Sequence, residues 1–346
     1  MEFFPQIVGN SALKRYFAEH IVSGRLAHAY LFVGASGSGK TSFALSLAAA
    51  MACTDSEKRP CGHCSVCRKL LNAQCADLTC ISSHAEKSAT IRVDTIRQMK
   101  ENADIFPNDL DFRIFLIDDA SDMNIQAQNA LLKLLEEPPA NVYLFLLATD
   151  LSRLLPTILS RVQVFHMERL HLQQMQQCLK QHAAAAACCA TDPKRYWEIL
   201  RIADGVIGRA QKLFAMTPGQ YADADQVRIY RCAAEVMELF AHPARSRAHL
   251  LAFLQDHVPD RDQCGKLIDW LMAAMHDLLL FKKGADARML AFFFDAESVE
   301  RVAASLTAAQ SARIYESLGD LRQMTQANLN VNSMLCTLVA ALYGSK

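Results

Sequence analysis

One short turn constrains the fold of this 346-residue chain more than any other feature of its sequence. Residues 34–41 read Gly-Ala-Ser-Gly-Ser-Gly-Lys-Thr and match the pattern G-x-x-x-x-G-K-[ST]. The turn lies between an apolar run typical of a buried strand, Ala29–Val33, and a helical pattern, Thr41–Ala52. Because glycine has no Cβ, such a turn lets several backbone N–H groups converge on phosphate oxygens at a helix N-terminus. We therefore predict a nucleotide-binding P-loop.

The pattern assigns a role to five residues of the turn. Gly34, Gly37 and Gly39 are expected to shape the phosphate cradle. Lys40 is expected to reach the β- and γ-phosphates, and the hydroxyl of Thr41 to hold Mg²⁺. The alternative is a glycine-rich turn that matches by chance, which the flanking strand and helix disfavour. The predicted ligand is ATP or ADP with Mg²⁺.

Paired acids end a second apolar run. Residues 111–119 read Asp-Phe-Arg-Ile-Phe-Leu-Ile-Asp-Asp, which indicates a buried strand that ends in Asp118 and Asp119. A P-loop protein needs an acid here for the Mg²⁺ shell, and Asp118 is the candidate, with a helix-capping aspartate as the alternative. Hydrolysis also needs a base beside it. Asp119 is one methylene shorter than the usual glutamate, which displaces the carboxylate by about 1 Å, so binding is better supported than hydrolysis.

The order of elements predicts an α/β domain. A helical pattern at Ile125–Glu136 stops before Pro138 and Pro139, and a third apolar run follows at Val142–Thr149. Strands that alternate with helices imply a parallel sheet.

The second half of the chain has helical patterns with hardly any strand signal. They cover Leu170–Phe214, and further long ones follow at Cys264–Lys282 and Ala308–Tyr343. Thr217-Pro218-Gly219 is the clearest linker. We predict a nucleotide-binding domain at residues 1–166, a small helical unit at 167–216 and a larger helical domain at 217–346.

Four cysteines after the P-loop helix indicate a metal site. Cys53, Cys61, Cys64 and Cys67 have the spacing Cys-x7-Cys-x2-Cys-x2-Cys, and four such thiolates can surround a tetrahedral Zn²⁺ ion. Because a site closed by four cysteines has no open position, the zinc is predicted to be structural. Alternative ligands are His63, Cys75 and Cys80. The remaining six cysteines lie in helical patterns and are expected to be small core residues: Cys178, Cys188, Cys189, Cys232, Cys264 and Cys336.

Composition excludes several classes of function. Lys and Arg together number 36 and so do Asp and Glu, so the whole chain has no net charge that would gather a polyanion. A hydrophobic content of 51% excludes a disordered protein. No apolar run approaches the ~20 residues that cross a bilayer, and the first residues lack a basic, apolar leader. These features predict a cytoplasmic protein with reduced cysteines.

The chain resembles the clamp-loader subunits of bacterial DNA polymerase III, the delta-prime and gamma/tau AAA+ proteins. Besides the P-loop and the four cysteines, the segments that carry the resemblance are Pro5–Gly9, Leu26–Phe32, Asn129–Pro139 and Leu155–Arg161. The resemblance implies an α/β AAA+ P-loop domain with a parallel sheet and a small zinc module, followed by a helical lid and an all-α collar domain.

The resemblance also implies a place in an assembly. In that family a Ser-Arg pair, here Ser160 and Arg161, presents its arginine to ATP on the neighbouring subunit. A planar guanidinium there stabilises the charge on the γ-phosphate, whereas the alternative is an ordinary surface ion pair. The implied partners are gamma/tau and delta subunits in a five-membered ring, the sliding clamp, and primed DNA.

Two departures favour the delta-prime type. Gamma/tau proteins carry Asp-Glu where this chain has Asp118-Asp119. They also carry a γ-phosphate-sensing arginine where this chain has Gly208, and Arg209, one place later, is rotated by about 100° on a helix. We expect nucleotide binding with weak or no hydrolysis. The alternatives are a gamma/tau-like motor ATPase with Asp119 as a shorter base, a zinc-containing small-molecule kinase, and a DNA-binding zinc protein.

Overall fold

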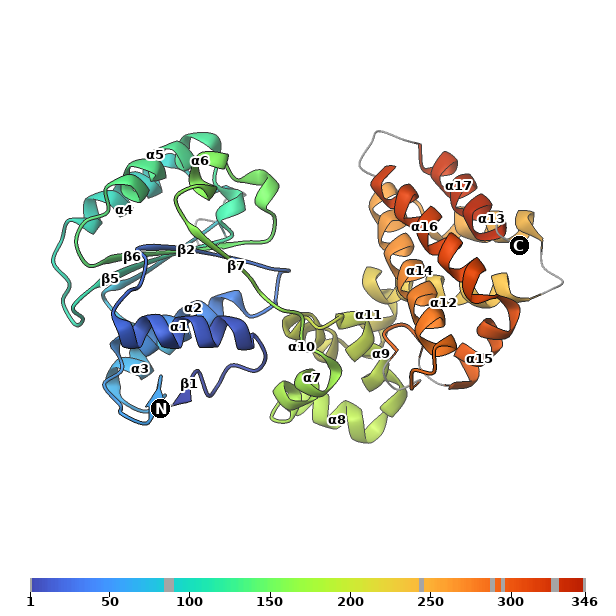
Figure 1. Cartoon of the computed structure of the whole chain (residues 1–346), viewed down its shortest axis with the longest axis horizontal. Coiled ribbons are helices and arrows are strands. Elements are labelled where there is room, and N and C mark those ends of the chain that lie inside the picture. Colours follow the sequence, from blue (N-terminus) through green and yellow to red (C-terminus); the bar gives the residue numbers. More distant parts are fainter. Residues whose placement is uncertain are drawn as a thin grey trace. The chain divides into compact units, whose positions relative to one another are not determined.

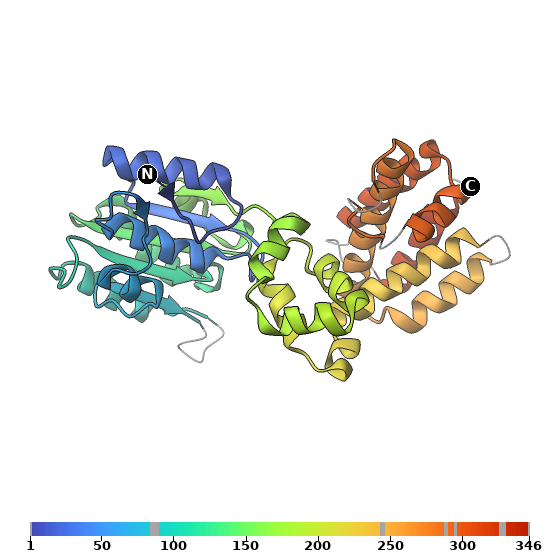
Figure 2. The ribbon, with the colours of Figure 1, turned by 90° about the horizontal axis from the view of Figure 1, so that it is seen from below.

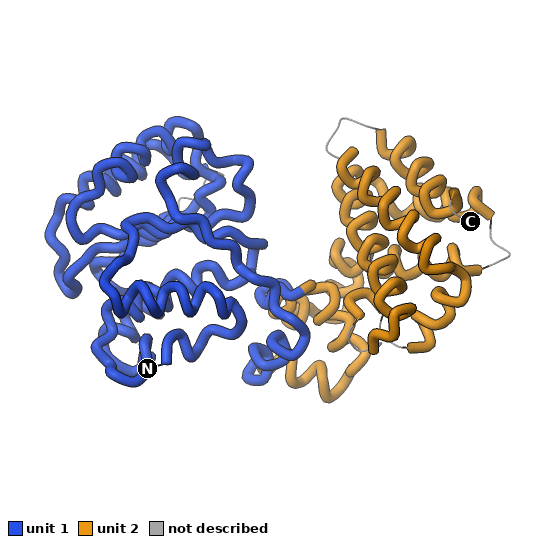
Figure 3. Tube along the Cα trace, viewed as in Figure 1, with its two compact units in different colours: residues 1–182, 205–209 blue, residues 183–204, 210–346 orange. Residues whose placement is uncertain are grey.

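The computed structural model describes residues 2–83, 90–242, 246–286, 290–293, 296–324 and 330–344. The chain forms two compact units (Figure 3), one of residues 1–182 with 205–209 and one of residues 183–204 with 210–346. Within the described ranges, no helix is long and apolar enough to span a membrane. All of the predicted site residues lie in the first unit.

A five-stranded parallel sheet is the centre of the first unit (Figures 1 and 2). In spatial order the strands are β4 (Leu78–Ser82), β5 (Arg113–Asp118), β6 (Val142–Ala148), β2 (Ala29–Val33) and β7 (Gln163–His166). The register pairs Val33 with Ala148 on one side and with His166 on the other. The carboxyl ends of these strands therefore meet at one edge of the sheet, the carboxyl edge, and their first residues at the opposite, amino edge.

Helices cover both faces of this sheet. One face carries α1 (Ser11–Ser23), α2 (Lys40–Ala52) and α3 (Ser65–Leu71), and the other carries α4 (Val93–Ala103), α5 (Ile125–Glu136) and α6 (Pro156–Leu159). Phe17 and Phe43 pack on Phe32 of β2 on the first face. Ile96 and Leu131 belong to the core of the second face. Covering both faces explains why the central strands are almost wholly apolar.

Short elements complete the first unit. They are β1 (Glu2–Phe3), β3 (Lys58–Arg59), the 3₁₀ helices η1 (Ala120–Asp122) and η2 (Leu151–Arg153), and α7 (Leu172–Leu179). Strands β1 and β3 pair in parallel as a separate two-stranded sheet.

Among its described residues, the second unit is built from helices. These are α8 (Ala183–Thr191), α9 (Pro193–Ala203), α11 (Pro218–Asp223), α12 (Asp225–Ala241), α13 (Arg247–His257), α14 (Arg261–Lys282), α15 (Ala296–Ser305), α16 (Ala308–Met324) and α17 (Val331–Tyr343), while α10 (Ile207–Ala215) begins in the first unit. Residues such as Leu271 and Leu278 of α14 are fully buried and form part of its core. The predicted architecture, an α/β domain with a parallel sheet followed by helical regions, is confirmed for the described residues.

Two local predictions differ from the structure. Pro218 and Gly219 do not form a linker but begin α11, because Thr217 caps the helix in a capping box and proline suits the first helical turn. The long pattern Ala308–Tyr343 divides into two helices, α16 and α17. The division into three parts stays a prediction.

The six remaining cysteines do not all pack in the core. Cys232 and Cys264 are buried, as expected. Cys189 and Cys336 are exposed, so the prediction is wrong for them, because they lie on solvent-facing positions of α8 and α17. Cys178 and Cys188 are only half-buried.

Candidate nucleotide and metal sites

The P-loop lies at the carboxyl edge, between β2 and α2. The N–H of Gly34 donates to the carbonyl of Ala148 in β6 at 3.1 Å, which ties the loop to that edge. Gly37 and Gly39 have φ values of 84° and 91°, in the left-handed region that favours glycine. Gly39 is the N-cap of α2, so the loop leads directly into a helix N-terminus whose free N–H groups suit an anion.

Lys40 is buried inside this loop and is 6% exposed. Its Nζ donates to the carbonyls of Gly34 at 2.8 Å and Ala35 at 3.2 Å. Burial lowers the pKa of its ammonium group, and the nearby carboxylates of Asp119 and Asp118 oppose that shift. The Oγ of Ser38 is also buried, and it has no hydrogen-bond partner among the described residues. A phosphate oxygen would accept from both groups, so these residues fit a bound phosphate.

The predicted magnesium ligands face one another beside the loop. Thr41 Oγ1 donates to Asp118 Oδ2 at 3.5 Å. Burial raises the pKa of Asp118, the charge of Asp119 raises it further, and that of Lys40 lowers it. Asp119 follows with a left-handed φ of 53° at the start of η1. The structure thus brings Lys40, Thr41 and Asp118 together, in an arrangement that suits a phosphate-bound Mg²⁺ ion.

A backbone contact that the sequence analysis missed closes over the P-loop. The N–H of Gly208 donates to the carbonyl of Gly37 at 2.9 Å. A Cβ on Gly208 would lie 2.8 Å from the Cα of Gly37, which is closer than real Cβ contacts. The position at which the resemblance places a sensing arginine therefore presents backbone to the P-loop. Gly37 and Gly208 are far apart in the sequence, so no local pattern could have predicted this contact.

Arg161 lies at the opposite edge of the sheet from the P-loop. It precedes β7, whose Gln163 pairs with Tyr30 at the start of β2, whereas the P-loop follows Val33 at the end of β2. The first and last of the four paired residues of β7 are about 10 Å apart at the usual rise per residue. The side chain is therefore remote from the P-loop of its own chain.

Three acceptors hold the guanidinium of Arg161. Its Nη1 donates to the carbonyl of Thr157 at 3.0 Å and to Ser160 Oγ at 3.1 Å. Its Nη2 forms an ion pair with Glu136 Oε1 at 2.8 Å. The predicted ion-pair alternative is thus present, but its partner, at the end of α5, was not foreseen.

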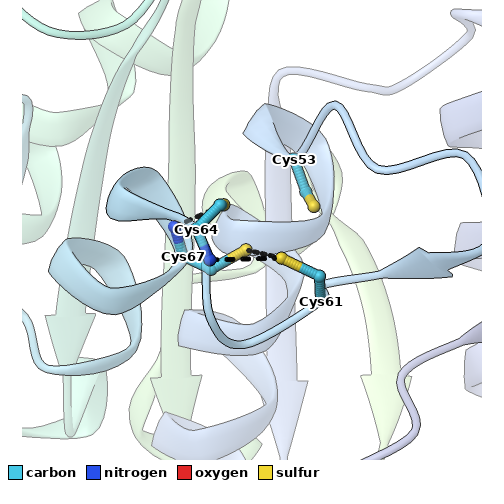
Figure 4. Close-up of side chains that lie close together, drawn as sticks. All are labelled: Cys53, Cys61, Cys64 and Cys67. Atoms are coloured by element: carbon cyan, nitrogen blue, oxygen red, sulfur yellow. Dashed lines mark hydrogen bonds between the residues drawn. The ribbon is translucent and has the colours of Figure 1, made fainter.

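The four predicted metal ligands converge (Figure 4). The sulfur atoms of Cys53, Cys61, Cys64 and Cys67 all lie within 4.8 Å of one another. The Sγ atoms of Cys61 and Cys67 are 3.9 Å apart, close to the edge of about 3.8 Å of a tetrahedron with Zn–S bonds of about 2.3 Å. Cys53 is the C-cap of α2 and Cys64 the N-cap of α3, so the cluster joins two helix ends. This geometry is consistent with a structural zinc site.

Two backbone N–H groups donate to sulfur atoms of the cluster and so favour the thiolate form that binds a cation. The N–H of Cys64 donates to Cys61 Sγ and that of Cys67 to Cys64 Sγ, both at 3.4 Å. The N–H of Cys64 is the main cause that lowers the pKa of Cys61 to about 6, whereas burial raises the pKa of Cys67. Because metal ligation requires a thiolate, Cys67 would give up its proton when a metal binds.

The alternative ligands do not complete this cluster. His63 groups with Asp55 and Cys61, within 4.8 Å of one another, on its exposed side. Cys75 and Cys80 belong to neither group in the part of the chain that is described.

Comparison with known proteins places the first unit in a family. Residues 9–171 match the family model described as "DNA polymerase III, delta subunit". These residues belong to the DNA polymerase III clamp-loader family. DNA polymerase III subunit tau of Salmonella typhimurium is 35% identical over 211 residues, which are 61% of this chain and 32% of that protein. Subunit tau of Bacillus subtilis is 32% identical over 171 residues, 49% of this chain and 30% of that protein.

The chain spans about a third of the length of those relatives. A solved structure of a gamma subunit-related protein from Thermotoga maritima is 16% identical, with a TM-score of 0.40, and the match covers 95% of this chain and 98% of that one. The resemblance drawn from the motifs is confirmed at the level of the clamp-loader family.

Proposed function

We propose that this chain is the delta-prime subunit of a DNA polymerase III clamp loader. It assembles with gamma/tau and delta subunits in a five-membered ring, and the ring uses ATP to load the sliding clamp onto primed DNA. In this ring the chain supplies Arg161 to the nucleotide of its neighbour and binds ATP or ADP with Mg²⁺ at its own P-loop. Tau relatives that are 32% to 35% identical support the complex in which we place it.

The position of Arg161 carries the proposal. The P-loop lies at the carboxyl edge of the sheet and Arg161 at the amino edge. This separation supports a role for Arg161 at a nucleotide held by another subunit. Its three acceptors hold the planar group in one orientation at the surface. A guanidinium presented in this way stabilises the charge that spreads over a transferring phosphoryl group.

The P-loop of this chain is proposed to bind rather than to turn over nucleotide. Lys40, Thr41 and Asp118 fit a phosphate and its Mg²⁺ ion. Asp119 is shorter than the glutamate that positions water. Gly208 brings no cationic side chain to the γ-phosphate.

The test is the DNA- and clamp-stimulated ATPase rate of a loader reconstituted with this chain. Arg161→Ala is expected to lower the rate at the adjoining site by about 10³-fold, and Arg161→Lys to recover little, because a lysine lacks the planar fork. Arg15→Ala on α1, also an exposed arginine, is the matched control and should leave the rate unchanged. An unchanged rate for Arg161→Ala in an intact ring would overturn the assignment.

The second candidate is a gamma/tau-like motor ATPase. The identity to tau subunits and the complete P-loop favour it. It predicts steady turnover of ATP by the chain alone, which Asp119→Asn should abolish. Under the delta-prime proposal, the isolated chain has no turnover above background.

A further inference from the structure

Residues 2–10, called the strap below, begin against residues 53–67, the loop that holds the four cysteines and is called the cysteine loop. The N–H of Glu2 donates to the carbonyl of Glu57 at 2.7 Å, and the N–H of Phe4 donates to that of Arg59 at 2.8 Å. Both acceptors lie between the first two cysteines of the cluster, Glu57 directly before β3 and Arg59 at its end. The side chain of Gln6 lies against Gly62, between the second and third cysteines. The start of the strap is therefore bonded to the loop that the cysteines close.

Phe4 attaches the strap to the P-loop helix. Its side chain is fully buried, and its ring stacks on Phe43 of α2 with 5.5 Å between the centroids. Its φ of 56° is in the left-handed region, which is costly for a bulky residue and persists only where the surroundings impose it. The conformation of Phe4 therefore depends on the hydrogen bond to the cysteine loop as well as on the packing against α2.

The far end of the strap contacts the segment that leads from β7 to α7. The side chain of Asn10, 3% exposed, accepts from the N–H of Glu168 at 2.8 Å. Gly9 is so close to Leu170 that a Cβ would lie 2.5 Å from Leu170 Cδ2. The strap thus has fixed contacts at both ends.

These contacts continue to the P-loop. The N–H of Leu170 donates to the carbonyl of Gly205 at 3.0 Å, and Gly208, in the same short segment, donates to Gly37. An unbroken series of contacts therefore leads from the cysteine loop through the strap to the P-loop. Such a series shows proximity, and coupling along it has to be measured.

The cysteine loop has little structure of its own with which to hold the strap. Strands β1 and β3 contain two residues each, and an isolated pair of strands is marginal even when longer. A metal ion bound by four cysteines would cross-link residues 53 to 67, and structural zinc contributes folding free energy directly. We propose that metal bound by the four cysteines anchors the strap against α2. The proposal rests on the metal cluster and requires no nucleotide.

Amide hydrogen exchange of the intact chain, without nucleotide, tests the anchor. Removing the metal with a chelator should speed exchange of peptides that cover residues 2–10 by about tenfold or more, while β5 and β6 stay protected. Adding Zn²⁺ back should restore the protection. Unchanged exchange of the strap after the metal is gone would overturn the proposal. Loss of protection throughout β5 and β6 would also overturn it, because the metal would then hold the whole domain.

Variants give the reciprocal test. Phe4→Ala is expected to release the strap while all four cysteines stay in place. Because coupling is reciprocal, this release should weaken metal binding by the same factor by which bound metal protects the strap from exchange. Competition with a chelating indicator measures that factor. Val22→Ala, an exposed apolar residue on α1, is the matched control and should leave metal affinity unchanged. Equal metal affinities for Phe4→Ala and the unaltered chain would contradict the anchor.

Discussion

The two ends of helix α2 carry two candidate sites, a proposed nucleotide site and a proposed metal site, which are built in different ways. At its start, Gly39 and Lys40 belong to a loop of eight consecutive residues whose backbone conformation suits a bound phosphate. At its other end, the C-cap Cys53 is one of four cysteines spread over residues 53–67. The first site is shaped by backbone hydrogen bonds and left-handed glycines, whereas the second needs a ligand to satisfy its thiols. A site made by the backbone forms with the fold, and a site made by side chains depends on what it binds.

The largest expected effect comes from removing the positive charge at the P-loop end of α2. Lys40→Met removes the ammonium group that would pair with the phosphates, and a charged hydrogen bond of this kind contributes about 1.5 to 3 kcal/mol per contact. We expect ADP affinity to fall about 100-fold with no change in zinc content, as measured by calorimetry and metal analysis. Lys69→Met, an exposed lysine on α3 paired with Asp109, is the control. Equal ADP affinity for Lys40→Met and the unaltered chain would break the comparison at its P-loop end.

Lowering the pH from about 7.5 to 5.5 should weaken zinc binding at the four cysteines more than nucleotide binding at the P-loop. Metal binding needs thiolates, so protons compete with zinc as the pH falls through the pKa of Cys61, about 6, and below the raised pKa of Cys67. Zinc affinity should fall by about 100-fold or more, measured with a competing chelator. Burial lowers the pKa of Lys40, but acid only adds protons to an amine, so lowering the pH leaves this group charged. The affinity for ADP without Mg²⁺ should therefore change by less than about tenfold. If lowering the pH weakened ADP binding more than zinc binding, the assignment of the two ends would be contradicted.

A smaller effect is expected where Gly208 approaches the P-loop. The Cβ of Gly208→Ala would lie 2.8 Å from the Cα of Gly37, so the segment must shift, at a cost of about 1 to 2 kcal/mol. Gly219→Ala in α11 is the control, because nothing lies within 4 Å of its added Cβ. Thermal unfolding should show a lower midpoint for Gly208→Ala than for Gly219→Ala. Equal midpoints would show that the P-loop end does not depend on this contact.

Local patterns predicted one end of α2 more completely than the other. The P-loop, α2, β2 and α5 follow from runs of neighbouring residues, and the structure places them within one residue of the prediction. The four cysteines were found by their spacing, but β1 and β3 beside them are too short to show any periodicity. The Gly37–Gly208 contact and the Glu136–Arg161 ion pair join residues far apart in the chain, and only the folded sheet brings them together.

The central claim is that the P-loop and Arg161 of this chain belong to two different nucleotide sites. Binding of Mg-ATP to the isolated chain, measured for Arg161→Ala beside the unaltered chain and Lys40→Met, tests it most directly. Because Arg161 lies at the amino edge, its replacement should leave the Kd of the isolated chain unchanged to within about twofold, while Lys40→Met weakens binding strongly. A tenfold or greater loss of affinity for Arg161→Ala would show that this arginine completes the site of its own chain, and would contradict the account.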